Sequence, residues 1–200
     1  MTLAELGVSL AAALAAWALG PWSGAPEVPA PRQRLVVAAM AAAMGGWLSR
    51  QPVGLPWVSL VGLSAAWAWV TLVDGQFRII PNRWVVATAL LGFFGRLFVH
   101  AGVDWSGVAL AAGLFLFLGG FHLISRGGLG MGDVKFGSAL GLALGWPAGM
   151  WATVLGLWAA AAWAGWLAWR GRRPREGAVA LGPFLVLGAL LGVLGPVSWR

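Results

Sequence analysis

Apolar residues follow one another along this chain in long runs, separated by short segments rich in Pro, Gly and Arg. The runs hold roughly 16 to 22 residues, the length that an α-helix needs to cross the hydrocarbon core of a bilayer. The pattern therefore predicts an all-α protein, a polytopic transmembrane helical bundle of about eight spans, with a range of six to eight. The predicted spans are 3–20, 34–49, 56–73, 84–100, 105–125, 134–149, 150–169 and 179–197.

The segment 134–149 is the least typical of these predicted spans. It is short, rich in glycine and closed by Pro147, a residue that interrupts helices. Two alternatives stay open there: a half-helix, or one long kinked helix joined to 150–169. If the two segments form one span, every later connection changes its side of the membrane.

Composition indicates a membrane protein, because 60% of the 200 residues are hydrophobic and only 10% are charged. Ordinary soluble domains carry far more charge. The chain contains no cysteine, which excludes disulfides, thiolate zinc sites and thiol nucleophiles. His100 and His122 are too few for a multi-histidine metal site. We therefore expect neither a metal nor a cofactor.

The positive charges predict how the chain is oriented in the membrane. Alternate connections hold most of the cations, the others hold only Arg50 and His100, and Arg96 lies inside a span. Basic residues collect on the cytoplasmic side, so the cation-rich connections are expected there. We attribute the net charge of +7 to topology and lipid headgroup contact rather than to nucleic-acid binding. The cation-rich connections hold Arg32 and Arg34, Arg78 and Arg83, Arg126 and Lys135, and RGRRPR at 170–175.

A single membrane domain, residues 1–200, accounts for the whole pattern, and no internal repeat is evident. Glu5 stands where a secretory signal would be basic, so a retained first span is expected rather than a cleaved signal peptide. Residues 21–33 are expected to form a short Pro-rich linker on the cytoplasmic side.

Two of the six acidic residues stand where an acid needs an explanation. Asp74 and Asp133 each lie at the boundary of a predicted span, on the same face of the membrane. Because an ionisable group at membrane depth is costly, each is a candidate functional residue. The alternative is structural pairing, of Asp74 with Arg78 and of Asp133 with Lys135.

Four glycines precede Asp133 in the stretch GGLGMGD, so a second backbone or carboxylate can approach it closely. A phosphate cradle is disfavoured, because the final Gly-Lys-Ser/Thr of a P-loop is absent. Two carboxylates at close range share one proton. The ionised one can take a proton from water while the protonated one hydrogen-bonds the peptide carbonyl, and a carboxylic acid then protonates the departing nitrogen. An aspartate pair is the hydrolytic machinery that this composition permits, and the sequence does not decide which member is protonated.

Three motifs stand in order along the chain: DGQFRIIPN at 74–82, GMGDVK at 130–135 and ALGPFLVLGALLG at 180–192. Together they resemble the motifs of the prepilin peptidases, or type IV leader peptidases, which are membrane aspartyl proteases of the Gly-x-Gly-Asp class. The resemblance extends over residues 35–197. It implies an aspartic endopeptidase with Asp74 and Asp133 as its catalytic pair.

The resemblance also implies a substrate and a location. The expected substrate is the short basic leader of a prepilin-like, pseudopilin-like or preflagellin-like subunit, cut after a glycine and before an apolar helix. The cut is expected at the cytoplasmic face of a prokaryotic cytoplasmic (inner) membrane, so the partners are this peptide and the lipid bilayer. Larger family members carry a cysteine-rich cytoplasmic domain and methylate the new N-terminus with S-adenosylmethionine. Here the linker 21–33 takes that place, which favours the compact peptidase-only form and argues against N-methyltransferase activity.

The same motifs contain further candidate site residues whose roles the sequence leaves open. Lys135 either tunes Asp133 or holds a substrate carboxylate, or it is a lysine whose ammonium snorkels to the interface. Pro81 and Asn82 are expected to end a loop and begin the fourth span. Gly182 and Pro183 either break the last helix beside the site or form a plain kink. The supporting set is Gly130, Gly132, Lys135, Pro81, Asn82, Gly182 and Pro183.

Three other functions compete with this interpretation. A presenilin-like protease would carry Tyr-Asp on the preceding helix, but the chain has no tyrosine and Val73 precedes Asp74. An ion-coupled transporter would need an inverted repeat and mid-membrane carboxylates, whereas both aspartates are predicted at one face. The third is a non-catalytic membrane scaffold for pilus assembly, which the intact aspartates of both motifs argue against.

Overall fold

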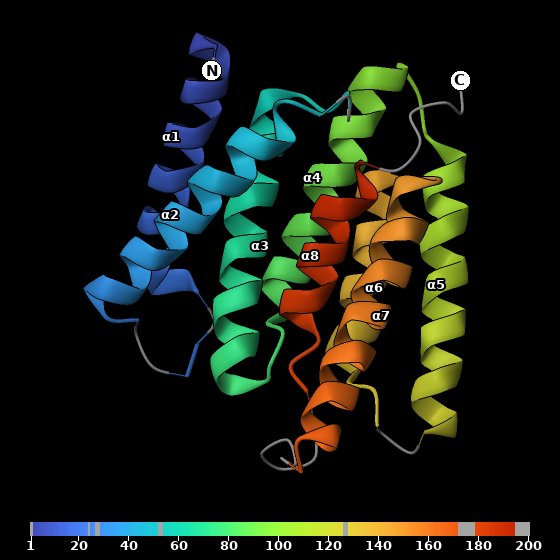
Figure 1. Cartoon of the computed structure of the whole chain (residues 1–200). Helices are drawn as coiled ribbons and strands as arrows, with labels where there is room; N and C mark the ends of the chain where they lie inside the picture. The colour runs from blue at the N-terminus through green and yellow to red at the C-terminus, as the bar shows by residue number, and fades with distance from the viewer. Residues whose placement is uncertain are drawn as a thin grey trace.

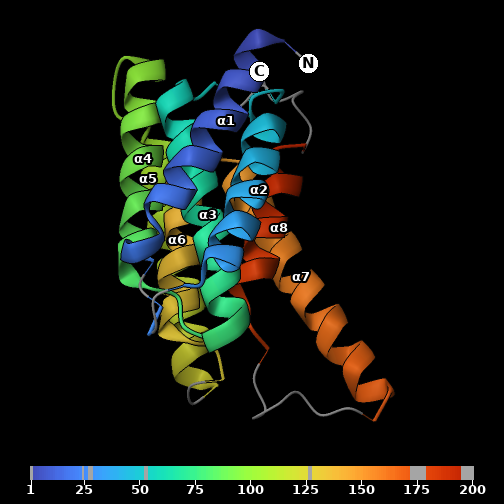
Figure 2. The same cartoon turned by 90° about the vertical axis from the view of Figure 1, so that its left-hand side faces the viewer.

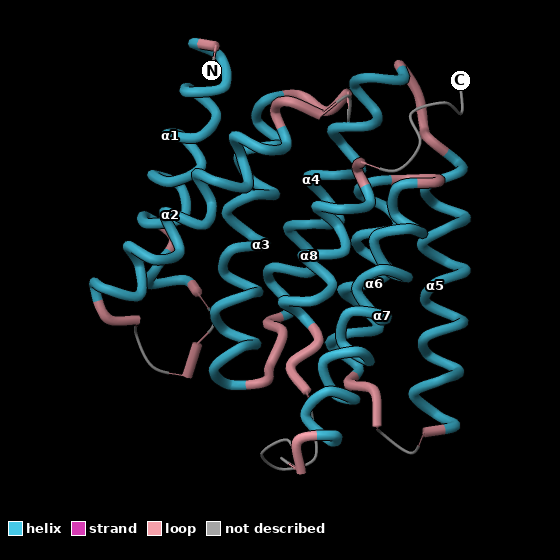
Figure 3. Tube along the Cα trace, viewed as in Figure 1, coloured by secondary structure: helices cyan, strands magenta, loops and turns pink. Residues whose placement is uncertain are grey.

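A computed structural model describes residues 2–23, 25–26, 29–51, 54–125, 128–171 and 179–194. This part of the chain is all-helical, with eight α-helices, one 3-10 turn (Gly20–Trp22) and no strand (Figure 3). The all-α prediction of about eight helices is therefore confirmed. The helices are α1 (Leu3–Ala18), α2 (Pro31–Leu48), α3 (Trp57–Phe77), α4 (Asn82–His100), α5 (Trp105–Ile124), α6 (Met131–Leu144), α7 (Ala148–Trp169) and α8 (Gly182–Gly192).

Three of the described helices, α3, α5 and α7, are long and apolar enough to cross a membrane. The helices α1 and α8 are also apolar but shorter, at 16 and 11 residues. The helix α6 has only 14 residues. Lengths and apolar composition therefore support a membrane protein whose long spans are accompanied by shorter helices.

The helices run alternately up and down, and α3 lies near the centre of the bundle (Figure 1). It contacts α1, α2, α4 and α8, while α6 packs against α4, α5, α7 and α8. The largest fully buried side chains are Trp67 and Trp69 of α3 and Phe136 of α6. By contrast, α5 lies at the edge of the bundle, and only Gly107 and Leu118 of it are buried. The core therefore sits around α3 and α6.

One end of the bundle gathers the α1–α2 and α3–α4 connections together with the first residues of α6 and α8 (Figures 1 and 2). This is the end that the sequence predicts to be cytoplasmic. That assignment stays a prediction, and several residues on which it depends lie outside the described part of the chain. These are Arg126, residues 172–175 and three positions of the linker 21–33, namely Gly24, Glu27 and Val28.

Two helix boundaries next to the aspartates differ from the predicted span boundaries. The helix α3 continues to Phe77 instead of ending at residue 73, and it stops where Arg78 adopts a left-handed conformation with φ +55°. The helix α6 begins at Met131 instead of 134. Asp74 and Asp133 therefore lie within helical turns, because the polar residues at both boundaries continue the helix.

The predicted end of α6 at 149 is also wrong, because the helix stops at Leu144, where Gly145 adopts φ +66°. The helices α6 and α7 are separate, which overturns the alternative of one long kinked helix. Gly182 and Pro183 begin α8 instead of breaking or kinking a helix. A proline is tolerated there because the first turn of a helix needs no N–H donor from it. The predicted end of the last span, 195–197, lies outside the described residues.

Candidate active site

Asp74 lies in the last turn of α3, and its side chain is directed into the protein. Only 4% of the residue is exposed. Its backbone oxygen accepts a hydrogen bond from the N–H of Arg78 at 2.9 Å, which closes the helix. The position of the carboxylate is thus fixed by the final turn of a central, buried helix.

The start of α8 reaches the Asp74 carboxylate across more than one hundred residues of sequence. The N–H of Gly182 donates a hydrogen bond to Asp74 Oδ2 at 2.7 Å. A Cβ atom at Gly182 would lie 2.9 Å from the same oxygen and 3.1 Å from Val70 Cγ1. Only glycine allows so close an approach without displacing the carboxylate.

Asp133 lies in the first turn of α6, three residues after Gly130. Its Oδ2 atom accepts a hydrogen bond from the N–H of Gly130 at 3.2 Å. A Cβ at Gly130 would lie 2.9 Å from that oxygen, and one at Gly132 would lie 3.3 Å from Ile80 Cβ. The glycines of the motif therefore bring α6 close to the α3–α4 connection and hold the Asp133 carboxylate against backbone.

Both aspartates line one cavity of about 230 Å³ at this end of the bundle. The chain brings them there from separate helices, and the two carboxylates are close enough to interact electrostatically. The cavity is lined by Asp74, Arg78, Ile79, Ile80, Asn82, Gly130, Gly132 and Asp133.

The structural pairing of Asp133 with Lys135 is not found among the described residues. Lys135 Nζ lies 3.4 Å from Asn82 Oδ1, so this lysine contacts the start of α4. In the described part of the chain no ion pair joins Asp133 to Lys135, whereas the Arg78 charge acts on Asp74 in the cavity that both residues line. Both carboxylates accept hydrogen bonds from backbone N–H groups.

The start of α4 is held in place by tryptophans. Trp84 Nε1 donates a hydrogen bond to the backbone carbonyl oxygen of Ser23 at 2.6 Å. The Trp84 ring stacks on the Trp69 ring with 6.5 Å between the ring centroids. Pro81 is the N-cap of this helix and Asn82 its first residue, as the sequence predicts. Asn82 is thereby fixed at the rim of the cavity that it lines.

Sequence reasoning did not identify Ile79 and Ile80, which form the apolar wall of the cavity. Both lie between Asp74 and Pro81 in the first motif, but an isoleucine carries no chemical signal. Arg78 also lines the cavity, where the sequence predicts it only as a topology marker or as a structural partner of Asp74. Four residues of the supporting set are not among those that line the cavity, although Gly182 reaches Asp74 through its N–H; the four are Pro81, Lys135, Gly182 and Pro183.

The donor set at this site suits proton transfer better than metal binding. Within the described residues no three His, Cys, Asp or Glu side chains are grouped so that they could hold a metal ion. Two carboxylates that line one cavity can hold a single proton between them, as acid–base pairs in hydrolases do. The fold and the site together define a helical membrane protein with a paired-carboxylate centre.

Comparison with protein families shows that the chain belongs to the type IV leader peptidase family, which it matches over residues 60–196. The matched range holds Asp74, Asp133 and all of the supporting residues. The protein is therefore a membrane peptidase of this family. Neither the curated proteins nor the solved structures give a significant match.

Proposed function

We propose that this protein is an aspartic endopeptidase that removes the short basic leader of prepilin-like, pseudopilin-like or preflagellin-like subunits. Cleavage takes place at the cytoplasmic face of a prokaryotic inner membrane. The observation that carries the proposal is the shared cavity of about 230 Å³, which both Asp74 and Asp133 line. Membership in the leader peptidase family supports the substrate class.

The reaction uses one ionised and one protonated aspartate. The ionised member takes a proton from water, whose oxygen attacks the carbonyl carbon, while the protonated member gives its proton to the carbonyl oxygen. The tetrahedral intermediate then collapses and its C–N bond breaks. The first aspartate gives the proton it took to the departing nitrogen, and the second regains one from the intermediate as the carbonyl reforms. The pair returns to its starting state with one proton.

The backbone donors orient the carboxylates for this reaction. Gly182 and Gly130 each bind the Oδ2 atom of one aspartate, which fixes the side chain without neutralising it by a cation. Preorganised groups of this kind do not need to reorient during proton transfer. The cavity is also smaller than the 300–1,000 Å³ typical of ligand pockets, so it favours a backbone segment with little side-chain volume. A glycine next to the cut bond meets this requirement.

The test is cleavage of a panel of prepilin-like substrates by the purified protein in detergent or lipid. Wild type is expected to trim the leader, and Asp74→Asn and Asp133→Asn are expected not to, with helical content and thermal unfolding unchanged. Glu5→Gln is the matched control, because Glu5 is an acid paired with Arg50 on another part of the bundle. Persistent cleavage by either variant assigns that aspartate a structural role. A substrate panel left uncut by wild type overturns the proposal and favours the transporter or scaffold.

A further inference from the structure

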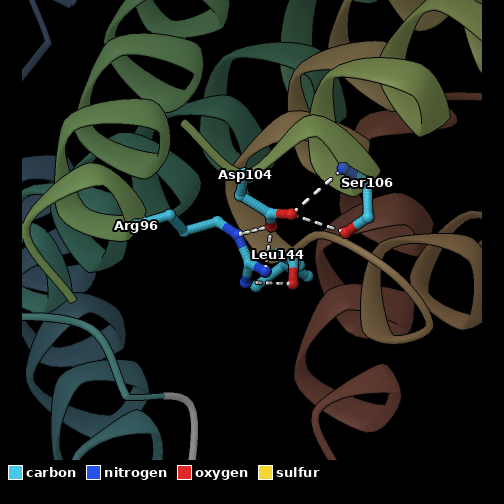
Figure 4. A network of polar contacts seen from close by, with 4 residues as sticks. All are labelled: Arg96, Asp104, Ser106 and Leu144. Carbon is cyan, nitrogen blue, oxygen red and sulfur yellow. Dashed lines mark hydrogen bonds and ion pairs between the residues drawn. The ribbon is translucent and has the colours of Figure 1, made fainter. Parts of the chain in front are cut away.

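A second polar network lies at the opposite end of α6 from Asp133 (Figure 4). Arg96 of α4 binds the Asp104 carboxylate through Nε at 2.6 Å and also through Nη2. Its Nη1 donates a hydrogen bond at 2.8 Å to the backbone carbonyl oxygen of Leu144, which is the last residue of α6. Asp104 in turn caps α5 by accepting from the N–H and hydroxyl of Ser106 at 3.1 and 2.6 Å. One guanidinium therefore joins the ends of three helices.

The backbone after α6 is shaped to receive this guanidinium. Gly145 has φ +66°, and its N–H closes the helix on the Gly141 oxygen at 2.9 Å. A Cβ at Gly145 would lie 2.5 Å from Arg96 Cζ and Nη2. The Arg96 guanidinium therefore packs against the backbone of Gly145, where a side chain would not fit. The side chain of Arg96 is only 13% exposed.

The helix α6 depends on such an anchor because it is short. Its 14 residues measure about 21 Å, less than the roughly 30 Å of a bilayer core. Its last carbonyl groups have no partner within the helix, and Leu144 is only 3% exposed, so an unpaired carbonyl there would be costly. The Arg96 donor at the Leu144 oxygen satisfies one of them.

Neighbouring helices pack closely on the small residues of α6, so the position of α6 along its axis decides whether these contacts fit. Gly137 and Gly141 face Leu118 and Leu114 of α5, and Ala143 packs against Gly92 of α4. A shift of one residue would move α6 by about 1.5 Å along its axis and turn it by about 100°. Either movement would change the position of the Asp133 carboxylate relative to Asp74 across the cavity that they share.

We propose that Arg96 is a positioning residue, which fixes the axial register of α6 and so holds Asp133 at the cavity wall. The expected effect of Arg96 on cleavage rests on the proposed peptidase function, whereas its effect on the position of α6 does not. Arg96 lies at the far end of α6 and does not touch the reacting groups.

The absence of native cysteine makes a direct test of the register possible. A Cβ at Gly132 would lie 3.3 Å from Ile80 Cβ, close to the separation of a disulfide-bonded pair. Ile80→Cys with Gly132→Cys is therefore expected to cross-link rapidly under mild oxidation. Adding Arg96→Met is expected to slow cross-linking several-fold. The matched control is Arg50→Met, which removes an arginine whose ion pair with Glu5 is more exposed.

Kinetics separate positioning from general loss of structure. On the native background, Arg96→Met is expected to lower kcat by about tenfold or more while the KM for the leader stays near the wild-type value. If Arg96→Met does not fold, Arg96→Lys serves instead, with intermediate cross-linking and activity expected because one ammonium replaces the planar guanidinium. Cross-linking at the wild-type rate in the folded variant overturns the proposal. The cross-linking readout needs no substrate, so it decides the inference even if the peptidase assay fails.

Discussion

The two polar sites at the ends of α6 treat their carboxylates differently. At one end Asp104 is held by the Arg96 guanidinium and by Ser106. At the other end Asp74 and Asp133 accept hydrogen bonds from backbone N–H groups and line a cavity. The same residue type thus forms a close ion pair in one place and is held by backbone N–H groups in the other.

The difference explains how one bundle can hold both a structural and a reactive carboxylate. An ion pair with additional hydrogen bonds joins helices and keeps its acid ionised. Glycine N–H donors fix the direction of a carboxylate without forming an ion pair with it, so a proton can still be exchanged between the two carboxyl groups. In a chain with only six acids, the surroundings of each acid decide its role.

Replacing one carboxylate with an amide at each end of α6 is expected to give the largest contrast between effects on cleavage and effects on stability. Asp133→Asn is expected to lower cleavage by at least about 100-fold with little change in thermal unfolding, because it removes a proton-transfer group. Asp104→Asn is expected to lower the unfolding temperature and to affect cleavage far less, because Arg96 keeps its contact with Leu144. Parallel assays of cleavage and thermal unfolding check both. The reverse pattern would mean that the two ends have been assigned incorrectly.

A smaller effect is expected at the backbone donor of the reactive end. Gly182→Ala places a Cβ 2.9 Å from Asp74 Oδ2 and so displaces the carboxylate. We expect kcat to fall roughly 10- to 100-fold, since small displacements of reacting groups are costly. Gly165→Ala in α7 is the control, because a Cβ there meets nothing within 4 Å. Equal activity of the two variants would show that the Gly182 contact is not needed.

The pH dependence of stability tests the structural end. Partial burial of Asp104 opposes ionisation, but hydrogen bonds from Ser106 and Arg96 and the Arg96 charge lower its pKa from 3.8 to about 2. The native state therefore favours the ionised form, and this stability is present above about pH 4 and is lost as pH falls through about 2. Comparing wild type with Asp104→Asn, we expect their unfolding temperatures to differ above pH 4 and to converge near pH 2. A difference that does not change with pH would contradict the ion-pair interpretation.

The smallest effect is expected at Lys135. Its ammonium lies 3.4 Å from Asn82 Oδ1 near solvent and makes no ion pair with Asp133 among the described residues. Lys135→Ala is expected to change stability by less than about 1 kcal/mol, as exposed polar contacts usually do. The cleavage rate should change less than about threefold, which corresponds to less than about 1 kcal/mol in the activation free energy. A large loss of cleavage, measured at saturating and at low substrate, would instead support a substrate-binding role.

Much of the fold could be predicted from local pattern. The sequence predicts α5 as 105–125 and α7 as 150–169, and the structure has them at Trp105–Ile124 and Ala148–Trp169. The ends of α3 and α6 were misplaced because apolarity does not mark where a helix stops. The left-handed conformations of Arg78 and Gly145 mark it instead.

The sequence by itself determined the all-helical membrane class and singled out Asp74 and Asp133, because long apolar runs and rare charges are local properties. Only the tertiary structure decided what surrounds them. The approach of Gly182 to Asp74 and the hold of Arg96 on the Leu144 oxygen join residues distant in sequence. Such contacts depend on how the helices pack. Almost every residue has a backbone N–H and a carbonyl group, so the sequence does not show which of these groups will bind a distant side chain.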